Sequence, residues 1–318
     1  MRVFFCEFVT GGGLRGEDLP PSLAREGAMM RDALARDLAD LSDVDLITTH
    51  DDRVAAPAGA DSHAIGKGCD AWALWAEIAA SADVSWLVAP ETGGALARLT
   101  GLVRSRCPVV VGPDDEAIRI GSSKRLTAER LAGHGIPTPV TWRPDDVPPD
   151  ATGPFVTKPD DGAGCEAIRI TDRRPPPGSL PPGHIVQRFV AGEAASLTVL
   201  RAGARTRLLA VNRQRVVVKD GAFAFRGVSV GALGDPDGRL AALADDIVQA
   251  IPGLEGLFGV DVVLGPGGPS VIEVNPRLTT AYAGLLASLG RNPATLVPPF
   301  ATAAATIAMA SREVEIAL

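Results

Sequence analysis

The sequence predicts an α/β fold in its first third and an α+β arrangement in the remainder. Between residues 1 and 112, short apolar runs rich in β-forming residues alternate with segments of helical spacing. That alternation indicates βαβ units and a parallel sheet. Beyond residue 150, short strand-like runs follow one another across glycine turns, which is typical of antiparallel hairpins. The length of 318 residues is enough for about two domains.

The first domain is expected to span residues 1–112. Its predicted strands are residues 2–9, 44–48, 85–89 and 108–111. Its predicted helices are residues 22–41, 71–80 and 96–103. Ser22 is the expected cap of the first helix, and a glycine turn at 11–13 follows the first strand.

The remainder begins with a short capped helix at 122–133. The predicted strands that follow are residues 155–158, 166–170, 184–189, 195–200, 206–212, 215–218, 259–264 and 270–274. A glycine-rich turn at 265–268 predicts that the last two strands form a hairpin. A helix is expected at 240–250, and the C-terminal part is expected to be helical.

Composition excludes several classes of function. With 46% hydrophobic and 22% charged residues the chain is globular, and a net charge of -7 gives no reason to expect nucleic acid as a partner. No run approaches ~20 apolar residues, and the start lacks the features of a signal peptide, so we expect a cytoplasmic protein without a membrane partner. Neither the four cysteines nor the four histidines have the spacing of a disulfide framework or a zinc site.

The expected hairpin at 259–274 carries the most informative residues. Side chains alternate across a strand, so Glu273 and Asn275 point to one face, and Asp261 faces them if the two strands pair. Two carboxylates and an amide carbonyl form an all-oxygen set that suits Mg²⁺. The alternative, polar positions in contact with solvent, fits poorly because both strands look buried on both faces.

Cations and glycines that suit phosphate lie earlier in the chain. Lys158 ends an expected strand, and Gly162 and Gly164 follow it, so that backbone N–H groups there can approach phosphate oxygens. Lys124 lies at a helix start and is a second candidate. Each feature alone is common, and the alternative for Lys158 is a surface lysine before an ordinary hairpin.

The expected parallel sheet offers two acidic residues near its carboxyl edge, where ligands bind in such sheets. Glu7 lies inside an apolar strand and therefore needs a partner. Either a substrate ammonium group or an internal salt bridge would provide it. Glu91 follows the third strand and precedes two glycines. Residues 11–16 match GxGxxG, but Pro20 and Pro21 separate them from the helix, which argues against dinucleotide binding.

Four segments together resemble the ATP-grasp superfamily of carboxylate–amine ligases. They are SSKRLTAERLAGHGIPTP (122–139), VTKPDDGAGCEAIRI (156–170), VQRFVAGEAASLTVL (186–200) and FGVDVVLGPGGPSVIEVNPRLTT (258–280). The resemblance implies a three-lobed fold, with an N-terminal α/β domain at 1–112 and two lobes, at 113–185 and 186–318, that clasp ATP. It also implies ATP and Mg²⁺ as cofactors, with two ions and with Mn²⁺ as a substitute.

The resemblance further implies roles for individual residues. Lys124 and Lys158 would contact the ATP phosphates, and the loop at 160–165, with Gly162 and Gly164, would close over them. Asp261, Glu273 and Asn275 would hold the metal.

The same resemblance places the adenine hinge at 187–190, with Gln187 at its start and with backbone groups of Arg188 and Val190 facing the base. Glu193 would bind the ribose, although the family often has its acidic residue at the next position, which is Ala194 here. Arg277 would stabilise the reacting phosphoryl or carboxylate group, and together with Lys158 it would be catalytic.

The start FFCEFVTGGGLRGEDLPPSLAREG and the phrase VAPETGGAL are similar to the tyramine–L-glutamate ligase group. That group forms a γ-glutamyl amide in the biosynthesis of methanofuran-type cofactors. The resemblance implies an ADP-forming C–N ligase with a small-molecule carboxylate and an amine as substrates, and it leaves a homodimer open. Glu7, Glu91 and Arg277 are the candidate substrate residues. The alternatives are a ligase for another amine or amino acid, of the dipeptide ligase type, and a catalytically silent ATP-binding protein.

Overall fold

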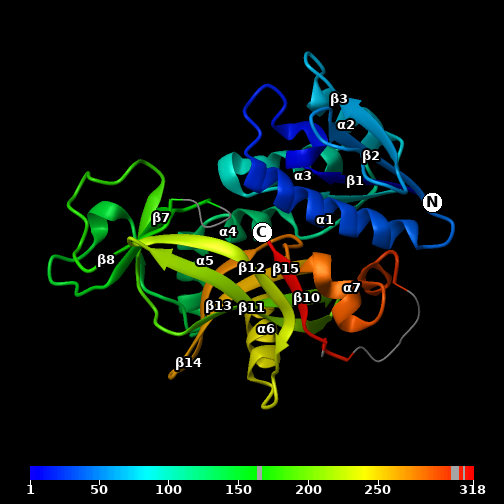
Figure 1. Ribbon diagram of the computed structural model, residues 1–318. Coiled ribbons are helices and arrows are strands. Elements are labelled where there is room, and N and C mark those ends of the chain that lie inside the picture. Colours follow the sequence, from blue (N-terminus) through cyan, green and yellow to red (C-terminus); the bar gives the residue numbers. More distant parts are fainter. Residues whose placement is uncertain (163–166, 302–307, 311) are drawn as a thin grey trace.

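The computed structural model describes residues 1–162, 167–301, 308–310 and 312–318. Its N-terminal part contains a five-stranded parallel sheet in the order β3-β2-β1-β4-β5 (Figure 1). The elements, in chain order, are β1 (Arg2–Glu7), η1 (Val9–Gly13), α1 (Pro21–Ala39), β2 (Asp45–Asp51), β3 (Asp61–Ile65), α2 (Ala71–Ala80), β4 (Val84–Val88), η2 (Thr92–Gly94), α3 (Ala95–Arg104) and β5 (Val109–Val111).

Alternate residues of β1 face opposite layers of this part, as the period of a strand requires. Val3 and Phe5 pack in the cluster that contains Leu34 of α1. Phe4 and Cys6 pack with residues of α2 and α3 in a second cluster. Helices therefore cover both faces of the sheet, which confirms the predicted α/β arrangement.

Three details of this part differ from the prediction. Ser22 is not the cap of α1, because the helix begins at Pro21 without a side-chain cap. Proline lacks an N–H group, so the first turn has one donor fewer to satisfy. The edge strand β3 was missed, since its exposed and polar sequence lacks a buried face. The glycine turn after β1 is the π-helical turn η1.

The remainder of the chain forms a ten-stranded sheet with helices against it. Its elements, in chain order, are α4 (Asp115–Gly121), α5 (Lys124–Gly133), β6 (Thr141–Trp142), η3 (Pro144–Asp146), β7 (Phe155–Pro159), β8 (Arg169–Thr171), β9 (His184–Arg188), β10 (Glu193–Ala202), β11 (Arg205–Lys219), β12 (Ala222–Leu233), α6 (Arg239–Ala250), β13 (Gly256–Gly265), β14 (Gly268–Asn275), α7 (Tyr282–Leu289), η4 (Pro293–Leu296) and β15 (Val314–Ala317).

The large sheet consists of two antiparallel halves that meet at one place. Its order is β14-β13-β10-β11-β12-β8-β7-β9-β6, with β15 paired to β12. The strands β8 and β12 pair through Ala222 and Arg169. Two backbone hydrogen bonds flank that pair, from Ile170 N to Gly221 O at 2.8 Å and from Phe223 N to Ile168 O at 3.2 Å. The expected hairpin of β13 and β14 and the expected pair of β7 and β8 are both present.

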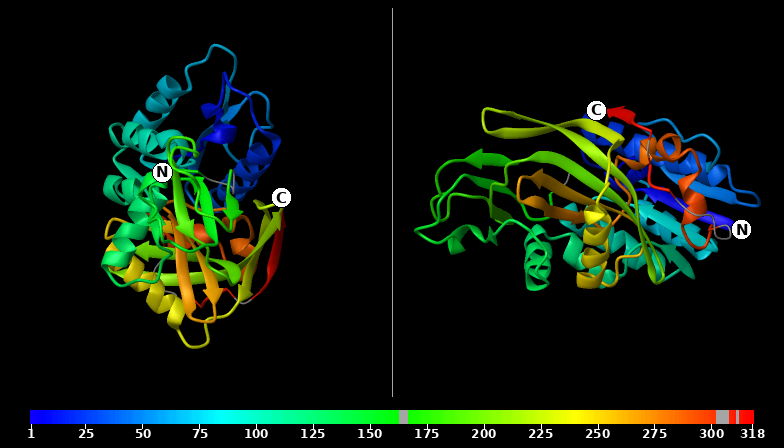
Figure 2. Two further views of the ribbon diagram at one scale, coloured as in Figure 1. Left: turned by 90° about the vertical axis from the view of Figure 1, so that its left-hand side faces the viewer. Right: turned by 90° about the horizontal axis from the view of Figure 1, so that it is seen from below.

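Two corrections concern the strands of this part. The runs at 206–212 and 215–218 are one strand, β11, and its partner β12 was missed. Together they form a long arm that projects from the body (Figure 2). The C-terminal part is not helical throughout, because β15 adds a strand to β12.

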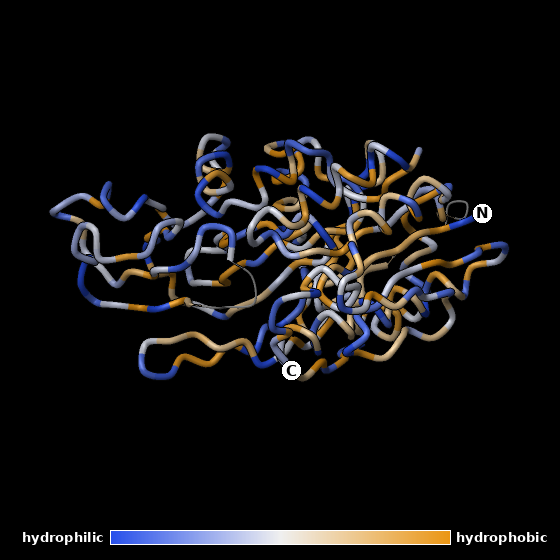
Figure 3. The backbone as a smooth tube through the Cα atoms, turned by 90° about the horizontal axis from the view of Figure 1, so that it is seen from above, coloured by the Kyte–Doolittle hydropathy of each residue, from blue (hydrophilic) through white to orange (hydrophobic). Residues whose placement is uncertain are grey.

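Hydrophobic residues concentrate in the strands and helices of the body, and hydrophilic residues predominate in the peripheral loops (Figure 3). The expected boundary between the second and third lobes, at 185/186, falls within β9. Within the described residues, no helix combines the length and the apolar character that a membrane crossing requires.

Candidate functional site

A cavity of about 410 Å³ lies between the two halves of the large sheet. Strands β7 and β9 contribute to one wall, and β10–β14 contribute to the others. The segment that follows β14 also borders the cavity, through Arg277 and residues 279–281. Of the residues proposed from sequence, the lining contains Lys124, Lys158, Gly162, Gln187, Arg188, Val190, Asp261, Glu273, Asn275 and Arg277.

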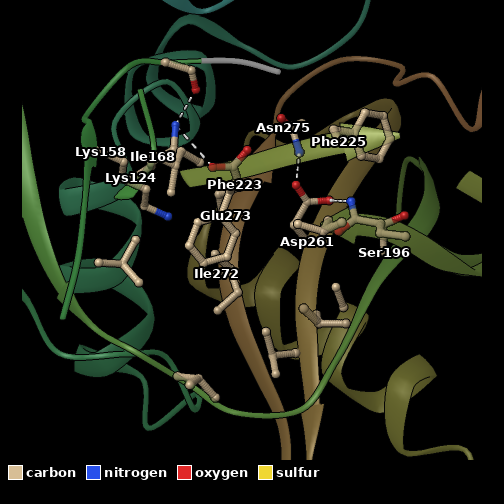
Figure 4. A pocket seen from close by; sticks show the side chains of 18 of the residues that line it. Lys124, Lys158, Ile168, Ser196, Phe223, Phe225, Asp261, Ile272, Glu273 and Asn275 are labelled. Atoms are coloured by element: carbon tan, nitrogen blue, oxygen red, sulfur yellow. Dashed lines mark hydrogen bonds and ion pairs between the residues drawn. The ribbon is translucent and has the colours of Figure 1, made fainter. Parts of the chain in front are cut away.

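The acidic part of the cavity is built on the β13–β14 hairpin. Asp261 pairs directly with Glu273 in the strand register, and Asn275 lies on the same face as Glu273 (Figure 4). Asn275 Nδ2 donates to Asp261 Oδ2 over 3.5 Å, and Gln214 Nε2 donates to Asp261 Oδ1 at 2.8 Å. The predicted juxtaposition of the three oxygen-bearing side chains is therefore present.

The two carboxylates affect one another's ionisation. Burial, together with the negative charge of Glu273, raises the pKa of Asp261. Burial also opposes ionisation of Glu273, but the charges of Lys124 and Lys158 outweigh it and lower the pKa of Glu273. Two adjacent carboxylates with an amide oxygen beside them are a donor set that fits a hard divalent cation. The residues present therefore fit the expected Mg²⁺.

Lys124 is a buried cation that pairs with Glu273 of this hairpin. Its Nζ lies 3.1 Å from Glu273 Oε2 and donates to Gly162 O at 2.5 Å. Burial opposes its charge, but Glu273 outweighs that effect and raises the pKa of Lys124. Lys158, the penultimate residue of β7, is 3% exposed and also lines the cavity. Two buried cations thus flank the acidic hairpin.

The loop that begins after β7 is tied to two neighbouring elements. Asp160 accepts the backbone N–H of Arg125 at 2.8 Å and the Ser123 hydroxyl at 2.7 Å, at the start of α5. Asp161 Oδ2 accepts the Gly93 N–H at 2.9 Å, and its carbonyl accepts the Thr92 hydroxyl at 3.0 Å. Gly164 and Cys165 lie outside the described residues. The described start of the loop is therefore held against both α5 and the N-terminal part.

Arg277 connects the cavity to the N-terminal part through Glu91. The guanidinium donates to Glu91 Oε2 at 2.8 Å, and the two side chains are 11% and 7% exposed. Burial opposes the charge of Arg277, but Glu91 outweighs it and raises the pKa of Arg277. Glu91 thus reaches the site through its ion pair with Arg277.

Three of the proposed residues that the structure describes are not among the lining residues: Glu91, which contacts Arg277, and Glu7 and Glu193, which have other partners. Glu7 accepts the Thr10 N–H at 2.7 Å, the Thr10 hydroxyl at 2.6 Å and the Val9 N–H at 3.2 Å, and burial raises its pKa. These donors satisfy the carboxylate without a substrate ammonium, and the described residues show no ion pair to it. Glu193 forms an ion pair with Arg213 at 2.6 Å, and both are 44% exposed. Neither Glu7 nor Glu193 is among the described lining residues.

The expected hinge borders an apolar part of the cavity. Gln187 Nε2 donates to Thr141 Oγ1 at 2.9 Å, which holds β9 against β6. Val156 and Ile272 line the cavity from opposite halves of the sheet. A flat apolar base would fit between such walls.

Sequence reasoning missed two groups of lining residues. Glu26 on α1 borders the cavity, and Thr280 donates a hydrogen bond to its carboxylate. Phe223 and Phe225, two residues apart on β12, line it from the projecting arm (Figure 4). Because residues two apart on a strand share a face, a prediction of β12 from the sequence would have placed both phenylalanines on one side of it. No local signal in the sequence identifies Glu26.

Two family models match the sequence of this chain. The model described as "ATP-grasp domain" matches residues 121–281, and the model described as "pre ATP-grasp 3 domain" matches residues 44–118.

Two relatives with curated names illustrate the sequence similarity. The tyramine–L-glutamate ligase of Methanocaldococcus jannaschii is 29% identical over 203 residues, which cover 64% of this chain and 58% of that protein. The 3-methyl-D-ornithine–L-lysine ligase of Methanosarcina mazei is 32% identical over 171 residues, which cover 54% of this chain and 42% of that protein. The matched regions therefore span well under two thirds of either relative.

Solved structures share the fold. An ATP-grasp superfamily protein from Archaeoglobus fulgidus has a TM-score of 0.73 at 24% identity, covering 93% of this chain and 87% of that one. The L-amino acid ligase of Bacillus licheniformis has a TM-score of 0.64 at 15% identity, covering 93% and 72%. The expected ATP-grasp fold is thereby confirmed. Because the ATP-grasp model alone spans half of the sequence and the fold agrees with it, this chain belongs to the ATP-grasp family.

Proposed function

We propose that the chain is an ADP-forming ligase that joins a carboxylate to an amine through an acyl phosphate. One observation carries the proposal: a single cavity gathers two buried lysines, a paired set of carboxylates with an amide, and a buried arginine. A triphosphate with its metal and a reacting carboxylate need that combination of charges. Membership of the ATP-grasp family supports it.

Each group in the cavity has a role in the proposal. Lys124 and Lys158 bind the phosphates, and Asp261, Glu273 and Asn275 hold Mg²⁺. When bound, the metal neutralises charge on the β- and γ-phosphates, with two ions expected and with Mn²⁺ as a substitute.

The proposal places the rest of the nucleotide along β9. The adenine lies beside the hinge, against the backbone of Arg188 and Val190, and Gly162 begins the loop that closes over the phosphates. Glu193 needs to leave Arg213 before it can bind the ribose.

The proposed reaction has two steps. A substrate carboxylate oxygen attacks the γ-phosphorus, ADP leaves, and an acyl phosphate forms. The amine nitrogen then attacks the acyl carbon, phosphate leaves, and the amide forms with loss of a proton from nitrogen. Arg277 stabilises the negative charge on the reacting oxygens. Positioning and charge neutralisation carry both steps, so no covalent enzyme nucleophile is required.

For the substrates we propose tyramine and the γ-carboxylate of L-glutamate, as in methanofuran-type cofactor biosynthesis. The relative from Methanocaldococcus jannaschii carries that name, and Phe223 and Phe225 provide an apolar wall that suits an aromatic amine. A second candidate is a ligase of the dipeptide type for two amino acids. The relative from Methanosarcina mazei, which is named for two amino acids, supports it.

An ADP-release screen of amines crossed with amino acids tests the proposal, with mass spectrometry of the product. Tyramine with L-glutamate is expected to stimulate ADP release and to yield the γ-glutamyl amide. Stimulation by a pair of amino acids alone would instead favour the second candidate. If a nonhydrolysable ATP analogue binds but no pair stimulates ADP release, the chain is a silent ATP-binding protein and the proposal is wrong.

A further inference from the structure

Glu26 is the residue of the N-terminal part, residues 1–112, that lines the described cavity. It lies in the second turn of α1, half-buried, and Thr280 donates its hydroxyl hydrogen to Glu26 Oε1. Thr280 itself is 6% exposed and follows Arg277 by three residues. A carboxylate of one lobe is therefore held by a buried hydroxyl of another at the edge of the cavity.

The packing of α1 fixes the direction of this side chain. Gly27, the next residue, lies against Glu7, and a Cβ atom added there would be 2.6 Å from Glu7 Oε2. That separation is too small for any other residue without movement, so α1 approaches the end of β1 closely at this turn. Glu26, one residue earlier, is directed towards the neighbouring lobe, where its carboxylate accepts the Thr280 hydroxyl.

The charge of Glu26 has the wrong sign for the anions that the proposed reaction brings into the cavity. Triphosphate and the reacting carboxylate would be repelled by it, and they have Lys124, Lys158 and Arg277 as partners. The metal has its own set on the β13–β14 hairpin, where Asp261 and Glu273 pair in the strand register, whereas the described hydrogen-bond partner of the Glu26 carboxylate is the Thr280 hydroxyl. The negative charge of Glu26 contributes to the raised pKa of Arg277, but the described hydrogen bonds of that guanidinium go to Glu91 and to Leu278 O. The complementary ligand is an organic cation.

We propose that Glu26 binds the ammonium group of the amine substrate, with Thr280 as the residue that positions its carboxylate. The inference rests on the proposed function. Glu26 reaches the cavity from α1, whereas the phosphate-binding lysines reach it from α5 and β7. Once bound, the ammonium gives up one proton to solvent, and the nitrogen lone pair then attacks the acyl carbon from one face of its carbonyl group. An amine held by Glu26 would thus lie on the side of the cavity that the N-terminal part borders.

The test compares Glu26→Gln and Glu26→Asp with the wild type, using tyramine, L-glutamate and ATP. Loss of a charged hydrogen bond is expected to raise KM for tyramine about ten- to a hundredfold in Glu26→Gln. KM for L-glutamate and KM for ATP should stay within about twofold of their wild-type values. Glu26→Asp keeps the negative charge, so its KM for tyramine should lie between those of the wild type and Glu26→Gln. The matched control is Glu77→Gln, an exposed helical glutamate of the same part that does not line the cavity.

A second measurement separates charge recognition from a structural role. The alcohol analogue of tyramine, in which hydroxyl replaces the amine, is assayed as an inhibitor. In the wild type, the inhibition constant of the alcohol should exceed KM for tyramine. In Glu26→Gln the ratio of these two constants should fall about ten- to a hundredfold. Thr280→Val should raise KM for tyramine less than Glu26→Gln does, and Thr280→Ser should restore it.

The outcomes are distinguishable. If the wild type releases ADP with tyramine and L-glutamate but Glu26→Gln keeps its KM for tyramine, this inference is wrong and the proposed function stands. A rise confined to KM for L-glutamate overturns it as well, because Glu26 would then bind the other substrate. If no amine stimulates the wild type, the proposed function fails, and the inference fails with it.

Discussion

Glu91→Gln tests the buried ion pair that connects the N-terminal part to the cavity. The change removes one negative charge, keeps the shape of the side chain, and leaves the Arg277 guanidinium without its ion-pair partner, so that only the charges of Glu26 and Glu273 still favour its ionised form. Because the two side chains are 11% and 7% exposed, water cannot replace that partner fully.

The expected loss of stability follows from that burial. Removing one member of a buried pair costs about 3–5 kcal/mol, because the remaining charge stays uncompensated. Glutamine keeps an oxygen that can accept a hydrogen bond from Arg277, and the arginine borders an open cavity. We therefore expect the lower end, about 3 kcal/mol in the free energy of unfolding. That is a large part of the 5–15 kcal/mol that is typical of a folded protein.

Urea unfolding of the ligand-free protein measures this loss. The matched control is Glu193→Gln, which breaks the ion pair with Arg213 whose members are both 44% exposed, and it is expected to cost about 0–1 kcal/mol. A double-mutant cycle of Glu91→Gln with Arg277→Met gives the coupling between the two side chains. A loss below about 0.5 kcal/mol in Glu91→Gln, equal to the control, would refute the argument, because the pair would then behave as an exposed one.

Three further predictions concern the proposed nucleotide site. Glu273→Gln removes a charge of the metal-binding set, so it should abolish ADP release while circular dichroism stays unchanged; near-normal turnover would contradict the assignment. Lys158→Ala should weaken binding of a nonhydrolysable ATP analogue about ten- to a hundredfold by calorimetry, whereas the exposed Lys67→Ala should not; equal affinities would make Lys158 irrelevant to phosphate. Mass-spectrometric mapping of alkylation should show that Mg-ATP protects Cys165 but not the exposed Cys69, and equal rates at Cys165 with and without Mg-ATP would count against closure of the loop.

The acidic hairpin could be predicted because its information is local. Alternation along β14 determines that Glu273 and Asn275 share a face, and the glycine turn at 265–268 brings Asp261 opposite them. Both signals lie within one short stretch of sequence. The elements with strong periodicity, such as α2 at Ala71–Ala80, were likewise found with their bounds.

The rest of the site depends on packing between distant segments. Glu26 reaches the cavity because Gly27 lets α1 approach Glu7, and the sequence does not reveal that approach. Glu193 was expected at the ribose, but an arginine of the neighbouring strand pairs with it. The strand β12 was missed although Asp220 and Gly221, both with positive φ, form a recognisable hairpin turn. Its glycines at 227 and 231 weaken the β pattern.

The junction of β8 and β12 gives the large sheet a line of mechanical weakness. Across it the described strands pair at one residue, and two backbone hydrogen bonds hold the contact, each contributing about 0.5–1.5 kcal/mol. By contrast, β10 and β13 pair along nine positions from Glu193 to Arg201. Under load the sheet should therefore bend or part at this line long before either half deforms. Since the cavity lies between the two halves, widening it along this line would break few strand hydrogen bonds.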